Sequence, residues 1–362
     1  MRLVSIDMIT SEMTLAKTIY KGRQVYLTAG QDNIVKYKDN LRRIGIEYIY
    51  VEDELSEGIE IPDVVSDETR IKCRVALQDT ITRFAETSIL DIGEIQPGLN
   101  TMLEEIVINE DVKLSLNDIS IVDDYTFSHS VSVTVYGALL ARKLGMSQDD
   151  IHKLATGLLL HDIGKTMLDP DILFKPGRLE EEEFEYVKSH TTLGYEALGK
   201  CFSLSESSRI IALMHHERLD GSGYPKGLLG DRLSRFVRIA AIVDVYDALT
   251  SDRCYRPKWP ASKAVDYLIS RCGTEFDTDM VGTFVKQIAV YPNGSIIKLS
   301  NGFLAIVKSQ NNAAPLRPVI RVITDPEGKM IEPFEVDLMD ELSIVITESQ
   351  LELNNILKSR TP

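Results

Sequence analysis

Two short segments in the middle of the chain bring together residue types that bind metals. Residues 161–165 read HDIGK and follow an apolar stretch, and residues 215–225 read HHERLDGSGYP, in which two histidines precede a turn rich in glycine and proline. Neutral imidazole nitrogens and carboxylate oxygens bind borderline divalent ions, and an aspartate can bridge two ions about 3.5–4 Å apart. The two segments therefore predict metal-assisted hydrolysis, with a phosphate ester as the favoured substrate.

The spacing of the candidate ligands fits one ligand per helix. Successive intervals are 32 residues from His129 to His161, 29 to His190, 25 to His215 and 29 from His215 to Asp244. Each interval accommodates a helix and a loop, and a helical bundle can bring such ligands to a common centre. The predicted metal ligands are His129, His161, Asp162, His190, His215, His216 and Asp244. Glu217, Asp220 and Asp247 are expected behind them, as acceptors for imidazole N–H groups.

The adjacent pair His215-His216 limits where its helix can end. Neighbours on a continuous helix point about 100° apart, because the helix has about 3.6 residues per turn. Both rings can therefore reach one cluster only near the helix end, which the turn over residues 221–225 supplies.

Each residue alone also has a simpler interpretation. A lone His–Asp pair is usually a cap or a surface contact, and a histidine on an apolar helix is more often a satisfied core residue. His152, the sixth histidine, is interpreted as a surface residue. Five histidines on successive helices favour a metal site when they are taken together.

Three basic residues are candidates for binding phosphate. Lys165 lies one turn after His161, so both can face one pocket, where the ammonium could bind a phosphate oxygen. Arg253 and Arg256 follow Asp244 by nine and twelve residues and could grip phosphate groups. The alternative for all three is a solvated surface charge.

Composition suits a soluble protein of two or three domains. The 362 residues are 44% hydrophobic and 26% charged, with a net charge of −15, which disfavours duplex nucleic acid and anionic lipid as partners. The four cysteines form no CxxC pair, so reduced thiols are expected. No secretion signal and no run of 18 apolar residues is apparent, so we expect a cytoplasmic protein without a membrane span.

Hydrophobic periodicity predicts a multidomain chain with a central all-α bundle, a small α+β N-terminal domain and a small β C-terminal appendage. The expected parts are residues 1–65, a regulatory or interaction domain; 66–97, a helical linker; 98–292, the catalytic domain; and 293–362, a β-rich region. Central helices are expected over 125–144, 148–162, 179–200, 205–217, 234–249, 261–272 and 278–289. Strands are expected over 295–299, 303–307, 319–323 and 343–346.

Residues 100–292 resemble the HD-GYP family, a subgroup of the HD metal-dependent phosphohydrolases. HDxGK is generic to HD hydrolases, whereas the HHExxDGxGYP run is highly specific, and both are intact. The resemblance implies a bacterial cyclic di-GMP phosphodiesterase of signal transduction, which forms pGpG and often GMP by attack of a metal-activated hydroxide on phosphorus. It implies a centre of two or three divalent ions, often iron and sometimes manganese, and a catalytic role for Asp162 and Lys165.

The same resemblance assigns further roles. His129, His161, Asp162 and Asp244 would hold one ion, and Asp162 would bridge to a second held by His190, His215 and His216. Lys165, Arg253 and Arg256 would hold phosphate groups. Tyr224 and the GYP turn would shape the pocket mouth or a surface for a diguanylate cyclase or another signalling partner. A homodimer is also compatible with the sequence.

One departure from the family pattern bears on the number of ions. Members with three ions carry a glutamate four residues before the first histidine, where this chain has Tyr125 preceded by Asp124. A phenol is a poor ligand for a hard divalent ion at neutral pH. We therefore predict a binuclear site and leave the second cleavage, from pGpG to GMP, open.

Two other functions stay open. The first is an HD-type hydrolase of another nucleotide, including a different cyclic dinucleotide, because guanine selectivity is not readable from these residues. The second is a catalytically weak module that binds the dinucleotide or docks a partner.

Overall fold

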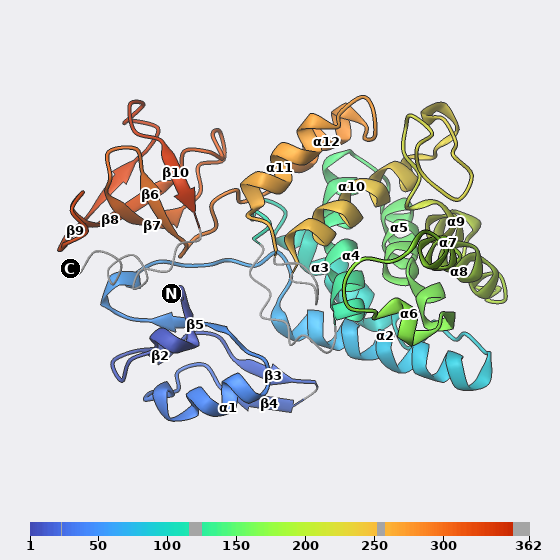
Figure 1. Cartoon of the computed structure of the whole chain (residues 1–362), viewed down its shortest axis with the longest axis horizontal. Coiled ribbons are helices and arrows are strands. Elements are labelled where there is room, and N and C mark those ends of the chain that lie inside the picture. Colours follow the sequence, from blue (N-terminus) through green and yellow to red (C-terminus); the bar gives the residue numbers. More distant parts are fainter. Residues whose placement is uncertain (23, 116–124, 252–257, 350–362) are drawn as a thin grey trace.

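The computed structural model describes residues 1–22, 24–115, 125–251 and 258–349. Figure 1 shows a helical bundle on one side of the molecule, and the N-terminal part and a C-terminal sheet together on the other. The predicted fold class is confirmed: a small α+β part precedes the bundle and a β part follows it. The domain limits given above remain predictions. No helix among the described residues is long and apolar enough to cross a membrane.

The N-terminal part consists of two small antiparallel sheets and a short helix around one apolar core. One sheet has the order β1-β5-β2 and the other pairs β3 with β4. Fully buried side chains such as Ile34, Leu41 and Ile49 fill the core. Its elements are β1 (Arg2–Ser5), η1 (Ile6–Met8), β2 (Thr14–Leu15), β3 (Ile19–Lys21), β4 (Gln24–Leu27), η2 (Ile34–Tyr37), α1 (Lys38–Arg43), β5 (Tyr48–Glu52) and η3 (Glu54–Ser56).

The central part is a bundle built around α4 and α10. These two helices pack against each other, and α4 also packs along α5, which in turn packs on α9. A helix that is apolar on nearly every side must be buried, as α10 is. The helices are α2 (Asp67–Thr87), α3 (Gln96–Ile108), α4 (Tyr125–Lys143), α5 (Gln148–Leu160), η5 (Ile163–Met167), α6 (Pro170–Leu173), α7 (Glu181–Lys188), α8 (His190–Leu198), α9 (Glu206–Met214), η6 (Gly230–Arg232), α10 (Arg235–Thr250), α11 (Ala261–Ser270) and α12 (Thr278–Val285).

The predicted helix over 179–200 is wrong in one respect, because it is divided at Ser189 into α7 and α8. The hydroxyl of Ser189 donates to the Tyr186 carbonyl at 2.6 Å, and Nδ1 of His190 donates to the Val187 carbonyl at 2.6 Å. Side chains that take the carbonyls of the preceding turn compete with the α-helical ladder. The break makes His190 the first residue of a new helix.

The C-terminal part is a five-stranded antiparallel sheet with the order β10-β6-β7-β8-β9. Its strands are β6 (Ile296–Leu299), β7 (Leu304–Ser309), β8 (Val319–Thr324), β9 (Met330–Asp337) and β10 (Ile346–Ser349). The sequence did not predict β9, because that strand carries Pro333, acidic residues and mostly exposed side chains. Such residues are tolerated at a sheet edge, where β9 lies.

The sheet is attached to the segment that leaves the N-terminal part. Arg321 donates hydrogen bonds to the carbonyls of Leu55 and Glu57 at 3.1 and 2.7 Å. Ile59 packs in one buried cluster with side chains of β6, β7 and β8. The first and last parts of the chain are thereby joined on the same side of the bundle (Figure 1).

Candidate metal centre

The turn after α5 presents the first His–Asp pair. Helix α5 begins at a cap in which the Ser147 hydroxyl accepts from the backbone N–H of Asp150, and it ends at Leu160. His161 and Asp162 therefore occupy the turn between α5 and η5 instead of a continuous helix. Gly164 follows at a point where α8 crosses so closely that a Cβ atom would lie 1.9 Å from the His190 carbonyl oxygen. This close crossing brings the turn next to His190.

The second pair lies at the end of α9, as the sequence predicted. Helix α9 ends at Met214, and His215 and His216 follow it. Their ring centroids are 4.0 Å apart, and the centroid of His190 lies 5.4 Å from that of His215 and 5.2 Å from that of His216. The helix end allows both neighbouring rings to face one point.

Backbone carbonyls fix the orientation of three imidazoles. Nδ1 of His161 lies 2.7 Å from the Leu158 oxygen, Nδ1 of His190 lies 2.6 Å from the Val187 oxygen, and Nδ1 of His215 lies 3.0 Å from the Ile211 oxygen. A carbonyl only accepts, so each Nδ1 donates and each neutral ring keeps its lone pair on Nε2. The three Nε2 atoms are thus prepared to be ligands.

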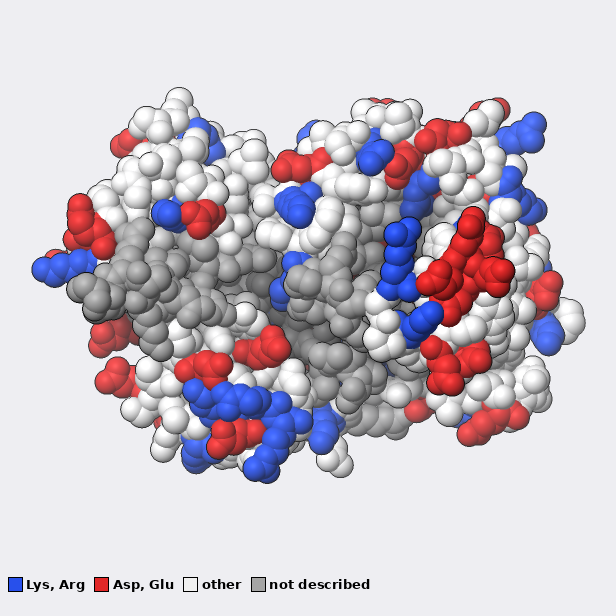
Figure 2. Space-filling model, in the orientation of Figure 1, with Lys and Arg blue, Asp and Glu red and all other residues white. Residues whose placement is uncertain are grey.

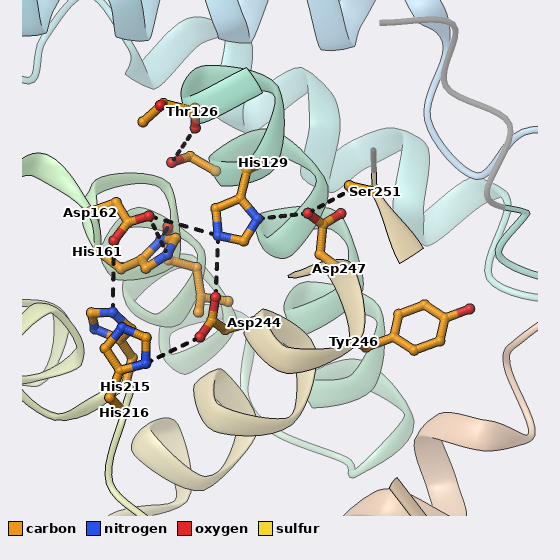
Figure 3. A network of polar contacts seen from close by, with 12 residues as sticks. Thr126, His129, His161, Asp162, His215, His216, Asp244, Tyr246, Asp247 and Ser251 are labelled. Atoms are coloured by element: carbon orange, nitrogen blue, oxygen red, sulfur yellow. Dashed lines mark hydrogen bonds and ion pairs between the residues drawn. The ribbon is translucent and has the colours of Figure 1, made fainter. Parts of the chain in front are cut away.

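Two clusters of ligand atoms meet at Asp162 (Figure 3). His129, His161 and Asp162 form one cluster, and His190, His215 and His216 form the other. Oδ2 of Asp162 lies 3.7 Å from Nε2 of His129 and 3.3 Å from Nε2 of His161. Oδ1 lies 3.6 Å from Nε2 of His190 and 3.7 Å from Nε2 of His215. Each oxygen of one carboxylate therefore faces a different cluster.

Asp244 of α10 lies on the other side of the two clusters. Its Oδ1 is 3.2 Å from Nε2 of His129, and its Oδ2 is 3.5 Å from Nδ1 of His216. Behind His129, Oδ2 of Asp247 accepts from Nδ1 at 2.6 Å. Asp247 thus directs Nε2 of His129 towards the centre (Figure 3).

The surroundings of the centre shift the pKa values of its histidines in different directions. Burial keeps the pKa of His215 well below its ordinary range and lowers the pKa of His216 to about 3. Burial acts the same way on His129, but its hydrogen bonds to Asp244 and Asp247 outweigh that effect and raise its pKa to about 9. Burial also opposes ionisation of Asp162, yet the neighbouring His161 and Lys165 hold the pKa of Asp162 well below its usual range.

Two polar atoms of the centre, Nε2 of His161 and Oδ1 of Asp162, are buried without a hydrogen-bond partner. Nε2 of His190 and Nε2 of His215 are 3.4 Å apart although both face each other with lone pairs. Such an arrangement is costly unless a cation lies between the atoms. The donor set, imidazole nitrogens and carboxylate oxygens, fits borderline divalent ions, and the two clusters are consistent with a binuclear site.

The side chains predicted to contact substrate are only partly described. The ammonium of Lys165 lies 2.6 Å from Oδ2 of Asp162, with about a quarter of its side chain (26%) exposed. The ring of Tyr224 lies on His216, with centroids 4.7 Å apart and planes inclined by 32°. Arg253, Arg256 and Asp124 lie outside the described residues, as does the side chain of Tyr125.

Two carboxylates differ from their predicted place. Glu217 is fully buried, but it accepts from the backbone N–H groups of Lys226 and Leu228 at 2.7 and 3.0 Å, not from an imidazole. Asp220 accepts from the N–H of Ser222 at 2.9 Å. Both therefore shape the loop that carries Tyr224. Sequence reasoning anticipated a loop there but could not see that the nearest donors to these carboxylates belong to its backbone.

Two residues important to this geometry were not singled out from the sequence. Gly164 permits the close crossing of α8, and its place inside HDIGK was the available signal. Phe184 of α7 contacts the ring of Tyr224, with centroids 6.4 Å apart. Only its distance of six residues from His190 pointed to the site.

Comparison with known proteins gives a consistent result. Residues 115–280 match the HD domain, and residues 296–356 match a KOW domain associated with the HD domain. A cyclic di-GMP phosphodiesterase of Pseudomonas aeruginosa is 37% identical over 223 residues, which are 62% of this chain and 54% of that protein.

Two further relatives differ in the substrate that their names give. A cyclic di-GMP phosphodiesterase response regulator of Xanthomonas campestris is 40% identical over 149 residues, 41% of this chain and 39% of that protein. A 3'3'-cGAMP-specific phosphodiesterase of Vibrio cholerae is 38% identical over 169 residues, 47% of this chain and 36% of that protein. The chain thus spans between 36% and 54% of the length of these relatives. Residues 115–280 are thus matched as an HD domain, and with its histidines and aspartates gathered at one centre this domain is HD-GYP-like.

Proposed function

We propose that the HD domain is a metal-dependent phosphodiesterase that hydrolyses cyclic di-GMP to pGpG, and to GMP where the second bond is also cut. The observation that carries the proposal is the position of Asp162, whose two oxygens each face one buried cluster of histidines. A carboxylate placed in this way can hold two ions at once.

The residues of the chain divide between two ion sites in this proposal. His129, His161 and Asp244 hold one ion and His190, His215 and His216 the other, with Asp162 shared by both. Two bound ions, iron or manganese, would activate a water for attack in line with the leaving oxygen and offset the charge that develops on phosphorus. Asp247 keeps the His129 ring in place.

Phosphate binding falls to the basic residues at the edge of the centre. Part of Lys165 is exposed beside Asp162, so a phosphate oxygen can reach its ammonium. Arg253 and Arg256 are proposed for the remaining phosphate oxygens because their spacing after Asp244 follows the HD-GYP pattern. The net charge of −15 makes such local positive groups necessary for an anionic substrate.

A second candidate substrate, 3'3'-cGAMP, belongs in the same experiment. The relative from Vibrio cholerae named for 3'3'-cGAMP is 38% identical, and the relative from Pseudomonas aeruginosa named for cyclic di-GMP is 37% identical. Sequence identity alone therefore does not decide whether the substrate is cyclic di-GMP, with two guanines, or 3'3'-cGAMP, with one guanine and one adenine.

The test uses protein purified without oxygen and loaded with Mn²⁺ or Fe²⁺. Wild type and Asp162→Ala are each incubated with cyclic di-GMP, 3'3'-cGAMP and cyclic di-AMP, and products are separated by chromatography while bound metal is measured. We expect wild type to bind about two ions per chain and to form pGpG, and Asp162→Ala to lose metal and activity.

His152→Ala is the matched control, because this half-buried histidine of α5 is not part of either cluster. It should keep both metal and activity. Metal-loaded wild type that leaves all three dinucleotides intact would refute the enzymatic proposal, and binding without cleavage would favour a binding module.

A further inference from the structure

An aromatic pair lies on the metal centre and continues outwards to the surface. Tyr224 covers His216, and the burial of its hydroxyl together with the nearby Asp244 and Asp162 carboxylates raises the pKa of Tyr224. Phe184 of α7 meets Tyr224 nearly edge-on, with planes inclined by 79°.

A lysine holds the two rings together. Nζ of Lys188 lies 4.7 Å from the centroid of Phe184 and 5.4 Å from that of Tyr224, both within the range of a cation–π contact. Glu185 pairs with the same ammonium at 2.5 Å, which fixes the cation between the rings. Lys188 is also the last residue of α7, two residues before His190, so the aromatic pair lies next to the start of α8.

Phe184 is exposed although it belongs to this ordered group. Its exposed fraction is 45%, whereas Lys188, Tyr224 and His216 around it are at least partly buried. An isolated exposed apolar residue needs no explanation. A ring that is held by a neighbouring ring and a cation, and that stays 45% exposed beside a predicted phosphodiesterase site, offers surface to a second flat ring.

The charge of α7 limits which ligands can bind at the surface around Phe184. Glu181, Glu182 and Glu183 open the helix, and Figure 2 shows acidic side chains gathered over this region, with basic side chains directly beside them. An anionic substrate gains nothing from this surface by charge alone. Stacking on an aromatic side chain, by contrast, is available to every nucleobase.

We propose that Phe184 is a purine-stacking residue of the substrate site, and that Lys188 and Tyr224 are the residues that position its ring. The inference rests on the proposed function and deepens it: one base of the cyclic dinucleotide lies on Phe184 while the phosphates lie at the metal centre. Because stacking does not distinguish guanine from adenine, Phe184 selects dinucleotides over smaller phosphodiesters.

The experiment compares Phe184→Leu and Phe184→Trp with wild type. Leucine keeps the apolar contact but loses the flat ring, so KM for the dinucleotide should rise about 5- to 100-fold, with kcat and bound metal unchanged. Tryptophan restores a ring and should return KM to near the wild-type value. Phe202→Ala is the matched control, since Phe202 is a fully exposed phenylalanine on the loop beyond the far end of α8.

Binding is measured separately from hydrolysis, so that a failure of the stacking proposal can be distinguished from a failure of the phosphodiesterase proposal. A cyclic dinucleotide carrying 2-aminopurine is titrated into metal-loaded protein, because stacking quenches the fluorescence of that base. We expect quenching with wild type and Phe184→Trp and its loss with Phe184→Leu. Quenching without hydrolysis would support the stacking role of Phe184 and refute the proposed phosphodiesterase activity. An unchanged KM and unchanged quenching in Phe184→Leu would overturn the stacking role and leave the free ring to a protein partner.

Discussion

Glu217→Gln tests whether a buried carboxylate holds the loop that carries Tyr224. The carboxylate accepts from two backbone N–H groups, those of Lys226 and Leu228, and is fully buried. Glutamine keeps one oxygen, but its amide nitrogen cannot accept, so one of these N–H groups loses its partner. A hydrogen bond to a charged group contributes roughly 1.5–3 kcal/mol, and the orphaned donor adds to the loss. We therefore expect the loop to open about 30- to 150-fold more often, which corresponds to roughly 2–3 kcal/mol.

Hydrogen exchange at the two amides measures that opening directly. Exchange at Lys226 and Leu228 should accelerate by the same factor in the variant, since local opening exposes these groups to water. Bound metal should stay, because Glu217 contacts no metal-site imidazole, and KM should rise as Tyr224 leaves His216. Glu206→Gln is the control: Glu206 accepts a hydrogen bond from Tyr195 and pairs with Arg209 at the surface, where such contacts contribute little, so stability should change by no more than about 0.5 kcal/mol. Unaltered exchange at the two amides, or loss of metal, would refute this reasoning.

Three further perturbations address the centre. Gly164→Ala should destabilise the fold by about 3 kcal/mol or more and lower the metal content, because the added Cβ would meet a carbonyl at the start of α8. Gly282→Ala in α12 is the control, because a Cβ there meets nothing within 4 Å. Thermal unfolding should show this control to be neutral or stabilising. In metal-free protein, His216 stays neutral in the folded state with a pKa of about 3, below its ordinary value of 6.5. The unfolded chain therefore takes up the proton first, so stability is full above pH 6.5 and falls below it by roughly 1.4 kcal/mol per pH unit for this group. His216→Asn should flatten that slope in urea titrations at pH 5–7.5, and an equal slope would disprove the assignment. Asp247→Asn should weaken metal binding about 10- to 100-fold in chelator competition, because Asp247 orients His129; an unchanged affinity would contradict this.

Much of the architecture followed from local sequence signals. Ser147 and the two aspartates after it marked the start of α5, and the glycine-rich run after His216 marked the end of α9. Both signals are local, since caps and turns depend on residues a few positions apart. The gathering of the histidines was predictable for a related reason: the intervals between ligands fit helices joined by loops, although η5, α6 and α7 all lie between His161 and His190.

Contacts between distant segments were not predictable from the same signals. The division of α7 from α8 depends on Ser189 and His190 taking carbonyls of the preceding turn, which the helical periodicity of that stretch conceals. The place of Glu217 depends on a loop folding back by nine and eleven residues. The close passage of Gly164 past α8 depends on tertiary packing alone.

The attachment of the C-terminal sheet to the first part of the chain has a consequence for synthesis. Arg321 and its partner Glu57 are 264 residues apart, and Ile59 shares a buried cluster with strands β6 to β8. At about 5–20 residues per second, a ribosome needs roughly 13 to 50 s to add that length. During this interval the apolar side chains around Ile59 have no sheet to cover them, although the N-terminal core is already complete in sequence. The nascent chain therefore carries an exposed apolar segment around Ile59 until strands β6 to β8 have been synthesised.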